Sequence, residues 1–160
     1  MMNTMLAPRG GPLLSNLGSV AMAALFGNLL AGSPPAALGV RDGRLAPCPG
    51  SPNCVSSQAA DADHRIAPIA YTGDAAAAVA RLARVIAEQP GATIVAQHDG
   101  YIYATFQTPL MGFVDDVEFV VDPARSAIQV RSASRLGHRD FGVNRKRIET
   151  LRAEFGKAAT

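Results

Sequence analysis

The sequence lacks the short motifs that mark common catalytic and nucleotide-binding sites. It contains no G-x-S-x-G nucleophile elbow, no P-loop, no dinucleotide-binding fingerprint and no H-E-x-x-H. These absences argue against the corresponding hydrolase, nucleotide-binding and zinc-protease classes, and we expect no cofactor. There are two cysteines but no C-x-x-C pair, which argues against a thioredoxin-like redox centre.

Lysine is scarce, because thirteen of the fifteen basic residues are arginine. Guanidinium groups favour bidentate contacts with carboxylates or phosphates, although a GC-rich coding sequence would produce the same bias. The net charge is only +2, so we expect no nucleic-acid partner. The positive charge is nevertheless concentrated in residues 125–152, which hold seven arginines and one lysine against two acidic residues.

Charge is almost absent from residues 1–37, where Arg9 stands alone. The stretch 13–30 is mostly apolar, but its serines and asparagines make it too polar for a confident transmembrane helix. A basic residue followed by a short apolar core resembles a secretory signal. We therefore expect 1–37 to be a signal-like or disordered segment and 38–157 a single globular domain. The expected location is exported, periplasmic or envelope-associated; a cytoplasmic chain is the alternative.

Both cysteines, Cys48 and Cys54, lie in one seven-residue loop with two prolines and a glycine. Such turn residues bring the loop ends together, which makes a disulfide geometrically plausible. Two free thiols, or half of a metal site with His64, are the alternatives. The spacing matches no standard zinc motif, so we expect no metal.

Hydrophobic periodicity predicts an α+β fold: an antiparallel sheet of four to five strands with two helices, in the order β-α-β-β-β-β-α. The predicted elements are strand 66–71, helix 74–89, strands 93–97, 101–107, 113–121 and 126–134, and a final helix capped by Asp140 that buries Phe141. The loop 108–112 is expected to expose apolar side chains. The predicted core comprises Val79, Leu82, Ile86, Phe106, Phe119, Ile128, Val130, Ile148, Leu151 and Phe155.

Two turns predict strand register. An Asp99-Gly100 hairpin places Val95 opposite Ala104 and Ala96 opposite Tyr103.

A symmetric turn over 122–125 would place Asp116 opposite Arg131 and Phe119 opposite Ile128. This register makes Asp116 and Arg131 direct cross-strand partners.

Three segments, CPGSPNCVSS, FVDDVEF and IQVRSASRLGHRDFGVNRKRIETLR, together resemble the domain of unknown function 1499 family. The resemblance covers roughly residues 38–155. Members of this family look like exported or lipid-anchored bacterial proteins and chloroplast proteins. The resemblance implies export and a domain boundary, and it implies no catalytic residues, cofactor or substrate.

An acidic cluster precedes the basic segment. Asp116 and Glu118 alternate along one strand, so they share a face about 7 Å apart. They could act as a carboxylate pair, or form ion pairs with Arg131 and Arg135. Asp115 points to the opposite face and needs a partner if it is buried.

The basic segment is a candidate anion site, because serines, arginines and a helix N-terminus occur together. Asn144 falls on the apolar stripe of the final helix and is either a hydrogen-bonding anchor in the core or a site residue. The candidate anion-binding residues are Arg131, Ser132, Ser134, Arg135, Asn144 and Arg145.

These observations favour an extracytoplasmic, non-enzymatic binding or envelope-associated domain. Its expected partner is a small anionic ligand or an envelope component. The alternative is an enzyme of unknown type that uses Asp115, Asp116 and Glu118 with Arg131 and Arg135.

Overall fold

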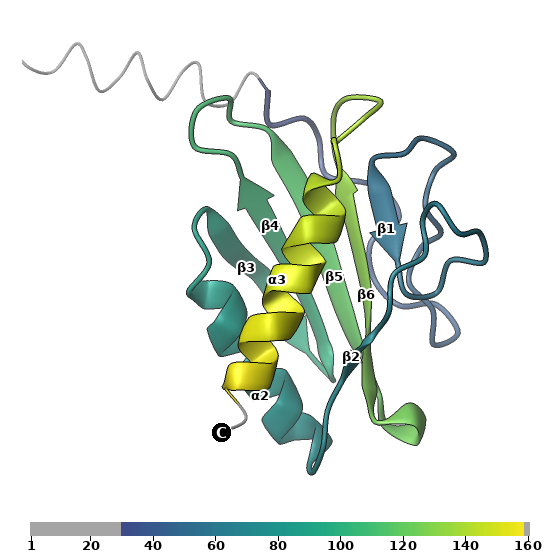
Figure 1. The fold of residues 1–160 in the computed structure, drawn as a ribbon, viewed down its shortest axis with the longest axis vertical. Helices are drawn as coiled ribbons and strands as arrows, with labels where there is room; N and C mark the ends of the chain where they lie inside the picture. The colour runs from purple at the N-terminus through teal and green to yellow at the C-terminus, as the bar shows by residue number, and fades with distance from the viewer. Residues whose placement is uncertain (1–29, 159–160) are drawn as a thin grey trace, which may run out of the picture.

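Four long strands form a continuous antiparallel meander in the computed structural model, which describes residues 30–158 (Figure 1). Two short strands pair with the last long strand, and the sheet order is β1-β6-β5-β4-β3 with β2 also on β6. The elements are β1 (Cys54–Ser56), β2 (Ile69–Ala70), α2 (Ala75–Ala87), β3 (Ala92–His98), β4 (Tyr101–Gln107), β5 (Val114–Asp122), the 3-10 turn η1 (Pro123–Arg125), β6 (Ala127–Ser134) and α3 (Val143–Lys157). The predicted α+β class is confirmed; β1 was not predicted.

Most of the segment predicted to be signal-like, residues 1–29, lies outside the described residues. Across residues 30–158, no helix has both the length and the apolar character needed to cross a bilayer.

Both helices pack on one face of the sheet, as Figure 1 shows. α2 begins where its sequence predicts, because the Asp74 carboxylate accepts the Ala77 N–H at 2.8 Å. The helices and the sheet enclose the main apolar core, which contains all ten predicted core residues. The predicted core is therefore confirmed.

α3 starts later than expected. Its first residue is Val143, preceded by Gly142 with a φ of 80°. Asp140 still caps the helix from further back, since its carboxylate accepts the N–H groups of Gly142 at 3.0 Å and Asn144 at 2.9 Å. The prediction that Phe141 is buried was wrong: the residue precedes the helix in a left-handed conformation and is 95% exposed.

The opposite face of the sheet is covered by the chain that precedes β1. Leu45 packs on Tyr101 and Tyr103, with Leu38 at the edge of this smaller cluster. The chain before β1 therefore shields this second face of the sheet from solvent.

The β3–β4 hairpin contains a bulge. Ala96 pairs with Tyr103 as predicted, but Ile94, not Val95, lies opposite Ala104. The register shifts between Ile94 and Ala96 and leaves Val95 56% exposed. Because the bulge adds one residue to β3, the residues of β3 before it face the side of the sheet opposite to the predicted one.

The β5–β6 register differs from the prediction by two residues. Phe119 pairs with Val130, and Arg131 lies opposite Glu118 instead of Asp116. The turn still contains four residues, but it lies one position further along the chain than predicted, at 123–126, because Asp122 pairs with Ala127. It consists of η1 and Ser126, which adopts a left-handed conformation. A shift of two residues preserves the faces of both strands, which explains why the predicted core survives the error.

Candidate functional site

The first buried polar group on the face opposite the helices centres on Glu118. One of its carboxylate oxygens accepts hydrogen bonds from the Tyr101 hydroxyl at 2.8 Å and the Gly39 N–H at 2.7 Å. Its other oxygen lies 3.6 Å from Nη1 of Arg131. Glu118 and Arg131 are both buried, and Glu118 connects the sheet to the chain before β1 through Gly39.

The second polar group on this face centres on Asp116. Arg135 donates from Nε to Oδ2 of Asp116 at 2.9 Å and from Nη2 to Oδ1 at 2.8 Å. The Tyr103 hydroxyl donates to the same carboxylate at 2.6 Å. Burial, together with the hydrogen bond to Asp116, raises the pKa of Tyr103 to about 12. The hydrogen bond to Asp116 likewise raises the pKa of Arg135.

These contacts correct the prediction that Asp116 and Arg131 are direct partners. Asp116 binds Arg135, and Arg131 faces Glu118. Asp116 and Glu118 share a face as expected, but each carboxylate has its own arginine. The acidic and basic side chains form two separate ion pairs.

The helix-facing side of β5 carries the third buried ion pair. Asp115 contacts Nη2 of Arg147 on the first turns of α3. The Arg147 guanidinium also lies 4.8 Å from the centre of the Phe106 ring, which gives a favourable cation–π contact. Arg147 therefore supplies the partner that a buried Asp115 requires.

Asn144 joins three parts of the chain and is fully buried. It accepts a hydrogen bond from the Ser132 hydroxyl at 2.5 Å. Its Nδ2 lies within hydrogen-bond distance of the Asn53 carbonyl at 3.1 Å, the Ser134 hydroxyl at 3.0 Å and the Asp140 carboxylate at 2.8 Å. The residue thus ties β6 and the disulfide loop to the start of α3.

The carboxylate of Asp140 binds the free N–H groups at the N-terminus of α3, where an anionic ligand could otherwise bind. Burial raises the pKa of this carboxyl, but hydrogen bonds from the Asn144 and Gly142 backbone and from the Asn144 side chain outweigh that effect and hold the pKa below its usual value. The backbone N–H groups of Gly142 and Asn144 could bind a ligand anion, but they donate their hydrogen bonds to Asp140 instead.

The six candidate anion-binding residues occupy different surroundings. Arg131 and Arg135 lie on the face opposite the helices, whereas Ser132 and Ser134 face α3 and bind Asn144. Arg145 donates to two backbone carbonyls, those of Arg65 at 2.8 Å and Asp63 at 2.9 Å. The structure does not bring these six residues together into one cradle.

The carboxylates proposed for the enzyme alternative are inaccessible. Asp115, Asp116 and Glu118 are at most 4% exposed, and each contacts an arginine. A general acid or base must reach the proton that it transfers. The arrangement therefore gives the enzyme alternative no support.

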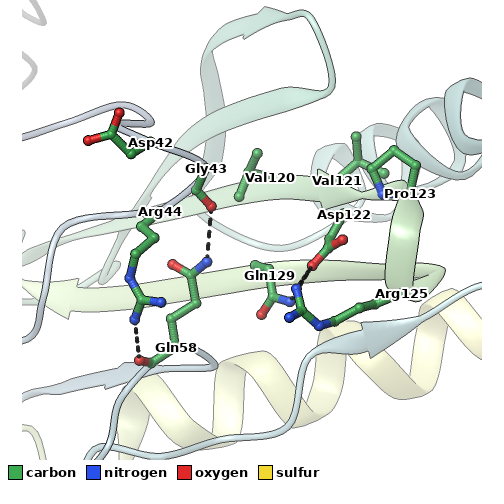
Figure 2. A pocket seen from close by; sticks show the side chains of 10 residues that line it. All are labelled: Asp42, Gly43, Arg44, Gln58, Val120, Val121, Asp122, Pro123, Arg125 and Gln129. Carbon is green, nitrogen blue, oxygen red and sulfur yellow. Dashed lines mark hydrogen bonds and ion pairs between the residues drawn. The ribbon is translucent and has the colours of Figure 1, made fainter.

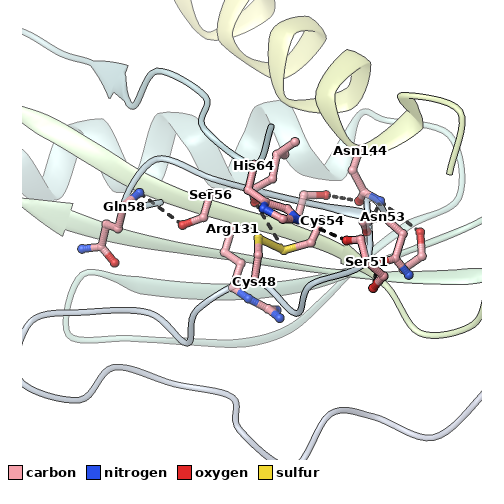
Figure 3. The surroundings of a disulfide bond; sticks show 12 residues. Cys48, Ser51, Asn53, Cys54, Ser56, Gln58, His64, Arg131 and Asn144 are labelled. Carbon is pink, nitrogen blue, oxygen red and sulfur yellow. Dashed lines mark hydrogen bonds between the residues drawn. A yellow bond between two sulfur atoms is a disulfide. The ribbon is translucent and has the colours of Figure 1, made fainter. Parts of the chain in front are cut away.

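The predicted Cys48–Cys54 disulfide is present, with Cα atoms 5.7 Å apart (Figure 3). The loop it closes binds the segment between β6 and α3, because Asn53 donates from Nδ2 to the Gly137 carbonyl at 2.7 Å. His64, which lies outside this loop in the sequence, is hydrogen-bonded to it: its Nε2 lies 3.2 Å from the Ser51 carbonyl oxygen.

His64 also binds Asp61, with Nδ1 at 2.7 Å from the carboxylate. The hydrogen bond to Ser51, helped by Asp61, raises the pKa of His64. No group of three metal-ligating side chains occurs in the described part of the chain.

A shallow hollow of about 440 Å³ lies between the 42–44 turn and the turn end of β5 and β6 (Figure 2). Several of the polar side chains that line it are hydrogen-bonded within the protein. Gln58 donates to the Gly43 carbonyl at 3.2 Å, and the Asp122 carboxylate accepts from Arg125 at 2.7 Å. Sequence patterns did not predict this hollow, because distant segments build it.

The structure defines a disulfide-stabilised α+β domain with a single antiparallel sheet and internally paired charges. The chain belongs to the family described as "Protein of unknown function (DUF1499)", whose model matches residues 44–155. No curated protein and no solved structure matched the chain. The resemblance inferred from the sequence is thereby confirmed.

Proposed function

We propose that this chain is an extracytoplasmic, non-enzymatic binding domain that works in association with the cell envelope and recognises an anionic group. The observation that carries the proposal is the Cys48–Cys54 disulfide. Disulfides persist in oxidising compartments and are rare in reducing ones. This disulfide closes the loop whose Asn53 carbonyl accepts a hydrogen bond from Asn144, so an oxidised loop is part of the folded domain.

Three further features support the proposal. The buried carboxylates are held in ion pairs, as structural groups are. The signal-like sequence pattern of the N-terminal segment is typical of exported chains. Arg139 and Lys146, beside the start of α3, are exposed and available to an anionic partner.

Thiol trapping combined with cell fractionation tests the location. Native cells are treated with an alkylating agent, fractionated, and the chain is analysed by mass spectrometry with and without prior reduction. We expect both cysteines to resist alkylation until they are reduced, and the chain to appear in the periplasmic or membrane fraction. The double variant Cys48→Ser, Cys54→Ser is the control for labelling. Two alkylated cysteines in a cytosolic chain would overturn the proposal.

A further inference from the structure

Three loops lie at one end of the sheet: residues 48–53, 108–113 and 135–142, here called the loop end. Strand pairing places them together, because Gln107 pairs with Val114, Asp115 with Ser134 and Cys54 with Ala133. Figure 1 shows the β4–β5 and β6–α3 loops projecting beyond the ends of these strands.

Large apolar side chains are concentrated at the loop end. Leu110 is 92% exposed and Phe141 is 95% exposed. Of the seven exposed large apolar residues in the described range, only Val40 and Val95 lie elsewhere. The five at or directly beside the loop end are Leu110, Met111, Leu136, Phe141 and Val143. Such a concentration marks an interaction surface.

The exposed charged residues in these three loops and on the first turn of α3 are basic. The segments 48–53 and 108–113 contain no charged residue. In 135–142 the one acid is Asp140, and its carboxylate binds Asn144 and Gly142. Arg139 and, on the first turn of α3, Lys146 are exposed. Apolar tips with exposed cations fit the interface of an anionic bilayer, where apolar groups enter and basic groups meet phosphates.

The N-terminal segment joins the domain at the same end. Arg135 donates from Nη1 to the Gly32 carbonyl at 3.5 Å, and a Cβ added at Gly32 would lie 3.0 Å from Cγ of Leu136. The sequence immediately before this point, residues 13–30, is mostly apolar. If that stretch associates with a membrane, the loop end is the part of the domain that it holds nearest to the lipid.

We propose that the loop end docks on the surface of an anionic bilayer, with Leu110 and Phe141 in the interfacial region and Arg139 and Lys146 against lipid phosphates. The inference rests on the proposed envelope association and names the partner of the domain.

Tryptophan fluorescence tests the docking directly, because the chain contains no tryptophan. The full chain is prepared with Leu110→Trp, Phe141→Trp or, as a matched control, His98→Trp. His98 has a side chain that is 64% exposed and lies at the β3–β4 turn, at the opposite end of the sheet. Circular dichroism confirms the fold of each variant.

Each variant is mixed with vesicles of phosphatidylcholine and phosphatidylglycerol that carry brominated acyl chains. We expect emission from positions 110 and 141 to shift to the blue and to be quenched, and emission from position 98 to remain unchanged. Adding Arg139→Gln and Lys146→Gln should weaken apparent vesicle affinity several-fold, whereas Arg84→Gln, an exposed arginine on α2, should not.

The possible failures are distinguishable. If the chain binds vesicles while positions 110 and 141 behave like position 98, docking through the loop end is overturned and envelope association stands. If emission from positions 110 and 141 is already shifted to the blue without vesicles and is not quenched when vesicles are added, the surface is covered by another part of the chain or by a second copy. This result also overturns the docking. A chain found alkylated in the cytosol defeats the proposed function itself.

Discussion

The pair formed by Asp116 and Arg135 offers the sharpest test of the structure. Arg135 reaches both oxygens of Asp116, a bidentate geometry that strengthens the contact. The side chain of Asp116 is 1% exposed and that of Arg135 10%, so water cannot readily replace either partner. Removing one partner leaves the other buried and unpaired.

The expected magnitudes follow from this burial. Arg135→Gln leaves the Asp116 carboxylate with only the Tyr103 hydroxyl, and we expect a loss of about 3–5 kcal/mol in the free energy of unfolding. Asp116→Asn should lose less, because the Arg135 guanidinium lies closer to solvent. The double variant should lose less than the sum of the two, by a coupling energy of roughly 0.5–3 kcal/mol.

Urea denaturation of the four chains of the double-mutant cycle measures this coupling. A second cycle with Asp116→Asn and Arg131→Gln is the matched control, because Arg131 faces Glu118. Its coupling should be clearly smaller. An Asp116–Arg131 coupling energy larger than the Asp116–Arg135 coupling energy would refute the β5–β6 register described above. It would also refute the assignment of ion-pair partners.

Three further predictions concern stability. Leu151→Ala should lower the free energy of unfolding by about 2–5 kcal/mol, because Leu151 is fully buried; a loss below about 1 kcal/mol in urea denaturation would mean that α3 is not docked as described. Asn144→Ala should lower it by on the order of 3 kcal/mol, since several buried partners lose a hydrogen bond; a nearly neutral effect by the same assay would contradict the anchoring role. The folded pKa of His64 is raised by its hydrogen bond to Ser51. Its stabilisation is therefore complete below the ordinary value of about 6.5 and is lost as pH rises through the folded pKa. His64→Gln should flatten this part of the stability–pH curve measured by thermal unfolding, and an unchanged slope would show that the contact is absent in solution.

Local sequence determined the four long strands, the two helices and the faces of β5 and β6. Asp74 before an alanine-rich stretch is a sufficient signal for α2, since the cap and the helix propensity act within one turn. Alternation along β5 and β6 fixed which residues face the helices. An even register error leaves that alternation intact, so the core residue Phe119 was predicted correctly although its cross-strand partner was not.

Tertiary structure decided which charges meet. The turn formed by η1 and the left-handed Ser126 lies one position later than the predicted turn, which shifts the register by two residues. Asp116 binds Arg135, nineteen positions away. The partner of Asp115 comes from α3, because packing of that helix on the sheet brings Arg147 to it.

The loop end shows the same division. The uncharged sequence of 108–112 predicted an exposed apolar loop, but helix periodicity placed Phe141 in the core. Asp140 and Gly142 delay the start of α3 and turn Phe141 outward. The exposure of Phe141 depends on where α3 begins and on what lies opposite the side chain in space, and helix periodicity alone does not contain that information.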